Sequence, residues 1–167
     1  TILTGMGSLS YGETAGERMR LGVMLNDPEE EHSCFADNTH NDHYYNGVGV
    51  QNVYLGSYTR IDGTVVSGAS LADLVVESDT DLDAEMRTKL SATIRELGDI
   101  KHAAEAGFAY DMMLQAGNAA GEDLIMGGVN AFIDQTRSIE RVVAVLDVDA
   151  IAIEGSDSLD NPDAVFQ

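Results

Sequence analysis

The sequence predicts an all-α protein, an antiparallel bundle of about four main helices with an irregular connector and an irregular C-terminal tail. Apolar residues recur at three- and four-residue steps over three long stretches, which is the spacing of an amphipathic helix. The stretches are separated by short links, and short links place successive helices side by side and antiparallel. A chain of 167 residues that is 44% hydrophobic can bury one core, so we expect one domain over residues 1–167.

The first helix is predicted from about Leu9 to Leu25, where the apolar side chains fall roughly on one side. Pro28 ends it, because the residue before a proline is pushed out of the helical region. A second helix is compatible with Asn41–Leu55, although Gly47 and Gly49 each cost about 1 kcal/mol in a helix interior. We interpret both glycines as points of close packing against a neighbouring helix.

The connector over residues 56–68 alternates in polarity and contains Asp62 followed by Gly63, which predicts a turn or small hairpin. Ser70 is then a plausible N-cap of a short helix that extends to Ser78. Asp73 stands at the third helical position, so the pair has the spacing of a capping box.

The longest helical pattern runs from about Leu82 to Ala116, with Thr80 or Asp81 as its cap. Gly98 and Gly107 interrupt this pattern and are places where the helix could bend or divide.

A last long helix is predicted from about Glu122 to Leu146, after a glycine-containing turn. The tail over residues 147–167 carries six acidic residues and no basic one. We expect it to be irregular, with Phe166 as its anchor.

The charge of the chain is strongly negative, with 29 acidic against nine basic residues and a formal net charge of −20. Nucleic acids and anionic lipid surfaces would be repelled by such a surface, so we expect no nucleic-acid partner. The acidity fits either a solvated surface or a surface that gathers cations, and the two interpretations can coexist.

Cys34 is the single cysteine, which excludes an intramolecular disulfide, a cysteine-based zinc cluster and an iron–sulfur site. No stretch approaches the roughly 18 consecutive apolar residues of a membrane-spanning helix, and we expect no transmembrane segment. The first residues lack the basic start and apolar run of an export signal, and a start at Thr1 suggests a processed or truncated product.

The segment Glu29–Tyr45 is the strongest candidate for a functional site. Three of the four histidines, His32, His40 and His43, lie in it among five acidic residues. Imidazole and carboxylate ligands suit iron, zinc or copper, and on a helix His40 and His43 would share one face. The alternative is structural: the acidic and polar residues cap the following helix, and the histidines are hydrogen-bonded or exposed.

A second pattern, His102 followed by Glu105 on the longest helix, has a similar spacing. It has no companion motif on another helix, so we expect it not to bind metal.

Several motifs resemble the imelysins, which are also described as insulin-cleaving metalloproteinases and iron-regulated cell-envelope proteins. They begin with YGETAGERM and EEEHSCFADNTHNDHYYNGVGVQNVYLG. The resemblance continues through RIDGTVVSGASLADLV and QTRSIE to the ending EGSDSLDNPDAVFQ. It implies two helical-bundle halves, of which this chain is similar to the C-terminal one, and a periplasmic or outer-membrane location in the bacterial cell envelope.

The resemblance also implies a metal site that this chain supplies only in part. The family's G-x-H-x-x-E motif belongs to the first half, and His102 to Glu105 lacks its leading glycine because Ile100 holds that place. We therefore expect a partner, either a missing N-terminal half or a companion chain. The shared pattern in this half places the expected metal ligands at Glu31, His32, Asp37 and His40 and leaves His43 outside.

Three functions are compatible with the resemblance. The first is a non-catalytic extracytoplasmic protein of bacterial iron uptake or metal binding, whose metal is iron in preference to zinc. The second is an imelysin-type metallopeptidase, although this half has no recognisable protease motif. The third is a structural module whose polar segment only docks the other half.

Overall fold

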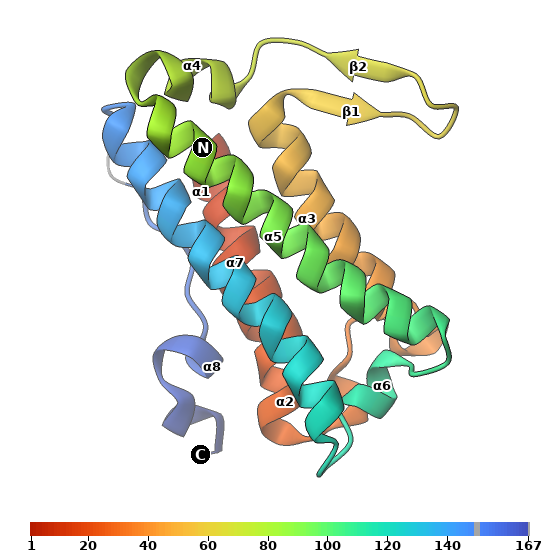
Figure 1. The fold of residues 1–167 in the computed structure, drawn as a ribbon. Coiled ribbons are helices and arrows are strands. Elements are labelled where there is room, and N and C mark those ends of the chain that lie inside the picture. Colours follow the sequence, from red (N-terminus) through yellow and green to blue (C-terminus); the bar gives the residue numbers. More distant parts are fainter. Residues whose placement is uncertain (149–150, 167) are drawn as a thin grey trace.

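Four long helical segments run alternately up and down and pack as a ring of neighbours in the computed structural model, which describes residues 1–148 and 151–166 (Figure 1). The first segment lies between α3 and α7, and α5 completes the ring by packing against both. The described elements are α1 (Ile2–Ser8), η1 (Leu9–Arg20), α2 (Leu21–Leu25), η2 (Pro28–Glu30), η3 (Cys34–Ala36), α3 (Thr39–Leu55), β1 (Ser57–Thr59), β2 (Val65–Ser67), α4 (Leu71–Ser78), α5 (Thr80–Glu105), α6 (Tyr110–Met113), α7 (Ala119–Val145), α8 (Asp157–Asp160) and η4 (Pro162–Phe166). The prediction of an all-α antiparallel bundle is confirmed.

The first long segment is one continuous helix made of α1, η1 and α2. Its two joints, at Leu9 and Leu21, keep right-handed helical backbone angles. It begins at Ile2, earlier than predicted, and ends where Asn26 adopts φ 51°, shortly before Pro28. Its middle part, η1, is a π-helix, a form that pairs residues five apart and is rare at this length.

The tail lies along one face of this helix, where small residues allow the two backbones to approach. A Cβ atom on Gly12 would stand 2.4 Å from the carbonyl oxygen of Glu154, so only glycine fits there. The backbone N–H of Glu154 donates to Ser8 Oγ (2.9 Å), and Ser158 Oγ donates to the carbonyl of Gly16 (2.9 Å). Contacts with the first helix therefore hold the tail in place.

The expectation of an irregular tail anchored by Phe166 is only partly right. The tail contains the short helices α8 and η4, and Phe166 is 66% exposed. Ser156 and Ser158 are buried instead and form the anchor, through hydrogen bonds to the Glu17 carboxylate and the Gly16 carbonyl of the first helix. Residues 149, 150 and 167 of the predicted tail lie outside the described residues.

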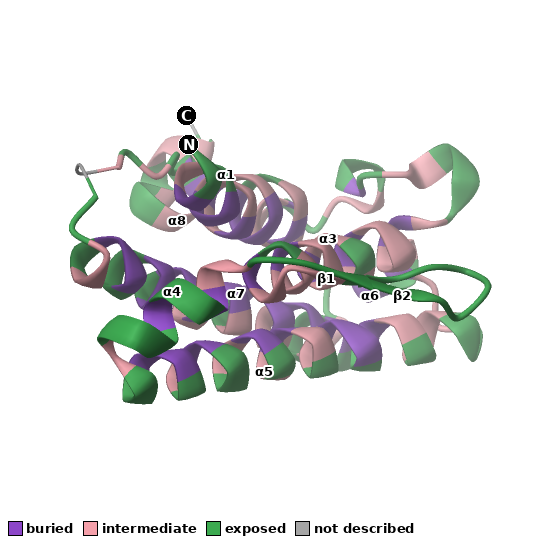
Figure 2. Cartoon of the chain, turned by 90° about the horizontal axis from the view of Figure 1, so that it is seen from above, coloured by how far each residue is buried: buried purple, intermediate pink, exposed green. Residues whose placement is uncertain are grey.

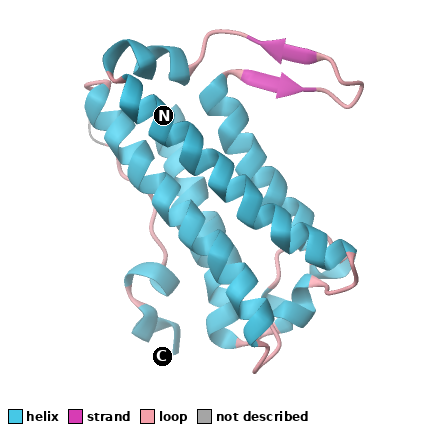
Figure 3. Cartoon of the chain, in the orientation of Figure 1, coloured by secondary structure: helices cyan, strands magenta, loops and turns pink. Residues whose placement is uncertain are grey.

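The connector forms the predicted hairpin, in which β1 and β2 are antiparallel with Tyr58 opposite Val66 (Figure 3). At the turn, Asp62 Oδ1 accepts a hydrogen bond from the backbone of Thr64 (2.9 Å). The capping box of α4 is also present, since the side chain of Ser70 accepts from the backbone of Asp73 and the Asp73 carboxylate accepts from that of Ser70. Both predictions are confirmed.

The predicted helix Leu82–Ala116 is divided near Gly107. That residue has φ +98°, a conformation that favours glycine, so α5 ends at Glu105 and the short α6 follows. The cap of α5 is Asp79, whose carboxylate accepts from the backbone of Leu82, rather than Thr80 or Asp81. The last long helix begins three residues before Glu122 because the Asn118 side chain caps it.

Two apolar clusters fill the bundle, one towards each end, with buried polar residues such as Thr93 and Gln135 between them. Buried residues line the facing sides of the long helices, whereas the hairpin is exposed (Figure 2). Gly47 lets α3 and α5 approach, because a Cβ there would stand 2.7 Å from Leu97 Cδ1. Close packing at Gly47 is therefore confirmed, whereas nothing lies within 4 Å of a Cβ at Gly49.

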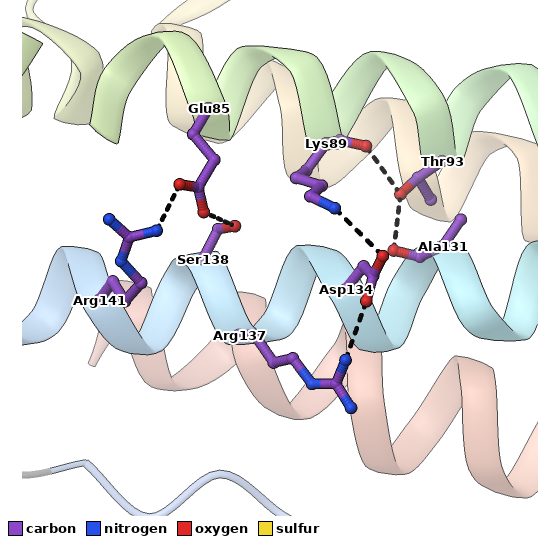
Figure 4. Close-up of polar contacts among 8 residues, drawn as sticks. All are labelled: Glu85, Lys89, Thr93, Ala131, Asp134, Arg137, Ser138 and Arg141. Atoms are coloured by element: carbon purple, nitrogen blue, oxygen red, sulfur yellow. Dashed lines mark hydrogen bonds and ion pairs between the residues drawn. The ribbon is translucent and has the colours of Figure 1, made fainter. Parts of the chain in front are cut away.

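A polar seam of side chains, some partly exposed and some buried, joins α5 to α7 (Figure 4). Glu85 accepts a hydrogen bond from Ser138 Oγ (2.8 Å) and pairs with Arg141. Lys89 Nζ lies 3.1 Å from Asp134 Oδ2, and the Thr93 hydroxyl reaches the carbonyl oxygens of both helices. These contacts fix the register of α5 relative to α7.

Within the described part of the chain, every helix is too short or too polar to span a lipid bilayer.

Candidate functional site

The segment Glu29–Tyr45 lies at one end of the bundle, between the last turn of α2 and the first turns of α3 (Figure 1). The short helix α6 packs against η2 at this end. Glu31 and His32 follow η2, Asp37 ends η3, and His40 and His43 stand in the first two turns of α3.

Local hydrogen bonds determine the path of this segment. Asp27 caps η2 by accepting a hydrogen bond from the backbone of Glu29 (2.9 Å). The backbone N–H of Ser33 donates to Thr39 Oγ1 (2.9 Å), and its hydroxyl bonds to Asp42. The chain therefore folds back on the start of α3. Thr39 has the turn role that the structural interpretation predicted, whereas Asn38, the N-cap residue of α3, makes no side-chain capping hydrogen bond.

The four predicted ligands differ in burial. Glu31 is 8% exposed and His40 is half-buried, whereas His32 and Asp37 are exposed. Over residues 1–148 and 151–166, no three His, Cys, Asp or Glu side chains are grouped so that they could hold one metal ion. The donor types thus suit a metal ion, but the four residues alone do not form a closed site.

Unpaired polar atoms are concentrated in this region. The described residues include seven buried side-chain nitrogen and oxygen atoms without a hydrogen-bond partner. Five of the seven are Glu31 Oε2, His40 Nδ1, both ring nitrogens of His43, and the hydroxyl oxygen of Tyr110. Such atoms are rare in folded proteins, since each costs about 1–3 kcal/mol of desolvation, and their concentration here points to a ligand.

His43, which the resemblance left outside the site, is fully buried. Burial lowers its pKa to about 3, and the nearby positive charges of His32 and Arg18 act in the same direction. The backbone carbonyl of Arg18 favours the charged form of His43 and so opposes this lowering of the pKa. Neither ring nitrogen of His43 has a hydrogen-bond partner of good geometry. At neutral pH the ring is uncharged and has an unshared lone pair.

Tyr110 on α6 is the member of this region that the sequence analysis missed. Its ring meets the ring of His43 edge to face, with centroids 5.2 Å apart. Burial raises the pKa of Tyr110, and the negative charge of Glu31 raises it further. No spacing pattern could have revealed Tyr110, because it lies far along the chain and reaches the site only through the turn at Gly107.

Glu31 lies close to Tyr110. Burial raises the pKa of Glu31, the Thr39 hydroxyl opposes this shift, and the carboxylates of Asp111, Asp37 and Glu29 add to it. A carboxyl group surrounded by other acids in this way is stabilised by a cation.

An open, polar pocket of about 560 Å³ adjoins the region. It is lined by Arg18, His32, Asn38, Asn41, Asp42, Tyr45 and Asn46. The larger cavity of about 870 Å³ lies at the opposite end of the bundle, next to α1 and α4, and is mostly apolar. It contains none of the candidate residues.

The second pattern, His102 and Glu105, makes other contacts. Glu105 pairs with Lys101, whose ammonium group also donates to Asn41 Oδ1 (2.8 Å), and His102 is exposed. The Glu105 carboxylate is therefore paired with Lys101, and a metal ion would have to displace that lysine.

Comparison with known proteins gives a family match over most of the chain. A family model described as Imelysin matches residues 1–139, from α1 into α7. The resemblance of residues 154–167 to the same family lies beyond this match and stays a prediction. No curated protein matches the chain.

Proposed function

Because the chain belongs to the imelysin family, we propose that it is an extracytoplasmic bacterial protein that binds a metal ion, iron in preference to zinc, as part of iron uptake. In this proposal the chain acts without catalysing a reaction. It resembles the C-terminal half of such a protein and forms one domain over residues 1–167.

The observation that carries the proposal is the pair of buried ligand atoms in the candidate segment that have no hydrogen-bond partner. Glu31 Oε2 and His40 Nδ1 both lack a hydrogen-bond partner. A carboxylate oxygen and an imidazole nitrogen are suitable ligands for iron, and a metal ion would compensate the cost of leaving them unpaired. His32 lines the polar pocket and Asp37 is exposed, so solvent gives a metal ion access to both side chains.

The proposed site is completed by groups outside this chain. The four ligands do not close around one ion among the described residues, and the open pocket leaves room for further ligands. We propose that a companion half or chain supplies them. Phe35, whose side chain is fully exposed beside the segment, is suited to contact that partner.

The test is metal analysis of the purified protein together with His32→Ala, His40→Ala and the control His102→Ala. The control removes an exposed histidine on α5 that lies outside the candidate segment. We expect bound iron to fall at least about tenfold in the first two variants, as is usual for loss of a ligand or its support, and to be unchanged in the control. Equal iron content in all four proteins would overturn the proposal.

A further inference from the structure

Three buried polar side chains, two from the candidate segment and one from α6, each have an atom without a hydrogen-bond partner. They are Glu31 after η2, His43 on α3 and Tyr110 on α6. We propose that these three residues form an inner metal site that binds ferric iron through carboxylate, imidazole and phenolate ligands. The inference rests on the proposed function and adds a second, inner set of ligands that shares Glu31 with the proposed site.

Tyr110 joins the other two residues. Its ring lies edge to face on His43, with a centroid distance of 5.2 Å. The charge of Glu31 is close enough to raise the pKa of its hydroxyl, and α6 packs directly against η2. Tyr110 therefore contacts His43 and lies near Glu31, although the three residues come from separate parts of the sequence.

Ordinary packing does not explain this group, as a comparison with Tyr54 shows. Tyr54 and Tyr110 are both fully buried. The hydroxyl of Tyr54 donates to Asp83 (2.9 Å), whereas the hydroxyl of Tyr110 has no partner. A buried phenol that only fills space would be replaced by phenylalanine at no cost, so an unpaired hydroxyl beside an unpaired imidazole and carboxylate indicates a shared ligand.

The donor set selects the metal. Zinc in proteins is bound by cysteine, histidine and carboxylates, and phenolate is not among its usual ligands. Iron accepts imidazole and carboxylate, and tyrosine ligates iron in some haem proteins. When ferric iron binds, the Tyr110 phenol gives up its proton to solvent, Glu31 binds as the carboxylate, and neutral His43 binds through a ring lone pair.

The polar pocket provides the route to this site. His32 lines the pocket, and its ring centroid lies 6.5 Å from that of His43. Arg18 also lines the pocket and adjoins His43 on the side of the first helix.

The experiment uses the full chain, stripped of metal and titrated with ferric nitrilotriacetate and separately with zinc. Tyr110→Phe removes a single oxygen atom, and Tyr44→Phe is the matched control at the same end of the bundle. We expect the unaltered protein and Tyr44→Phe to bind iron and to develop a visible phenolate-to-iron charge-transfer band. Tyr110→Phe should lose the band and bind ferric iron at least about tenfold more weakly, with zinc binding unchanged.

The outcomes separate this inference from the proposed function. A full-strength band in Tyr110→Phe, or iron binding without a band in the unaltered protein, overturns the inner site. If His32→Ala and His40→Ala lose iron while Tyr110→Phe keeps it, the proposed function stands and the inference fails. If the unaltered protein binds no iron, the proposed function fails as well. Should Tyr110→Phe misfold by circular dichroism, His43→Gln must weaken ferric binding, and unchanged binding there overturns the inference.

Discussion

The hydroxyl of Tyr54 on α3 donates a hydrogen bond to Asp83 Oδ1 on α5, at 2.9 Å, in the buried interface between the two helices. Asp83 Oδ2 also pairs with Arg87 Nε (2.7 Å), so the carboxylate keeps one partner when the other is removed. The contact fixes the two helices at the end of the bundle that lies away from the candidate site.

Replacing Tyr54 with phenylalanine should lower the free energy of unfolding by about 1 kcal/mol, the usual net contribution of one buried hydrogen bond. Tyr58→Phe is the control, because Tyr58 is 52% exposed on the hairpin. Urea denaturation of both variants measures the difference. Equal stability of the two variants would contradict the importance of this contact.

The stability of the polar seam should depend on pH through Glu85. The Ser138 hydroxyl and the Arg141 guanidinium both hold the pKa of Glu85 below its usual 4.5. A carboxyl whose pKa is lower in the folded state adds stability above its unfolded pKa and loses it as the pH falls through the folded value.

The free-energy difference between the unaltered protein and Glu85→Gln should therefore be largest at neutral pH and shrink below pH 4.5. We expect less than about 1 kcal/mol, because the pair is partly exposed and screened by solvent. Denaturation series of both proteins across this range provide the measurement. A difference that grows towards acid pH would show that the sign is wrong.

Gly12→Ala should detach the tail from the first helix. The added methyl group would stand 2.4 Å from the Glu154 carbonyl oxygen, and relief of such a clash typically costs about 1–3 kcal/mol. Limited proteolysis of the tail and thermal unfolding should both show the loss of this contact.

Gly49→Ala is the control, since its Cβ meets nothing within 4 Å and alanine should stabilise the helix by about 0.5–1 kcal/mol. Similar effects of the two substitutions would argue against a close approach at Gly12.

Ser70→Ala should destabilise α4 by about 1 kcal/mol, because the capping box loses the oxygen that accepts from the backbone of Asp73. Ser91→Ala, an exposed change inside α5, serves for comparison and should be neutral or slightly stabilising. Chemical denaturation measures both. The capping role would be refuted if Ser70→Ala were as stable as Ser91→Ala.

Local signals in the sequence predicted most of the fold. The hairpin at Asp62 and Gly63 and the capping box at Ser70 depend on residues a few positions apart, so their chemistry is visible in the sequence. The errors lie where distant parts meet. The sequence predicts Phe166 as the anchor of the tail, but Phe166 is exposed, and the tail binds a helix face that glycine and serine residues make suitable for hydrogen bonds.

The candidate site was predicted in its location but not in its membership. The density of histidines and acidic residues identified the segment. Residue types alone do not show which of these side chains point into the protein. His43 is buried and His32 is exposed because of the path that α3 and η3 take, which no spacing rule specifies. Tyr110 reaches the region through a break in the longest helix.

The contact between the tail and the first helix also bears on the order in which the protein is made. Gly16 and Ser158 are bonded across 142 positions of sequence, so the first helix leaves the ribosome long before its covering segment exists. During that interval its small-residue face is open to water, to chaperones and to other nascent chains. Long-range closure of this kind slows folding, and completion of the structure must wait until synthesis has passed α8.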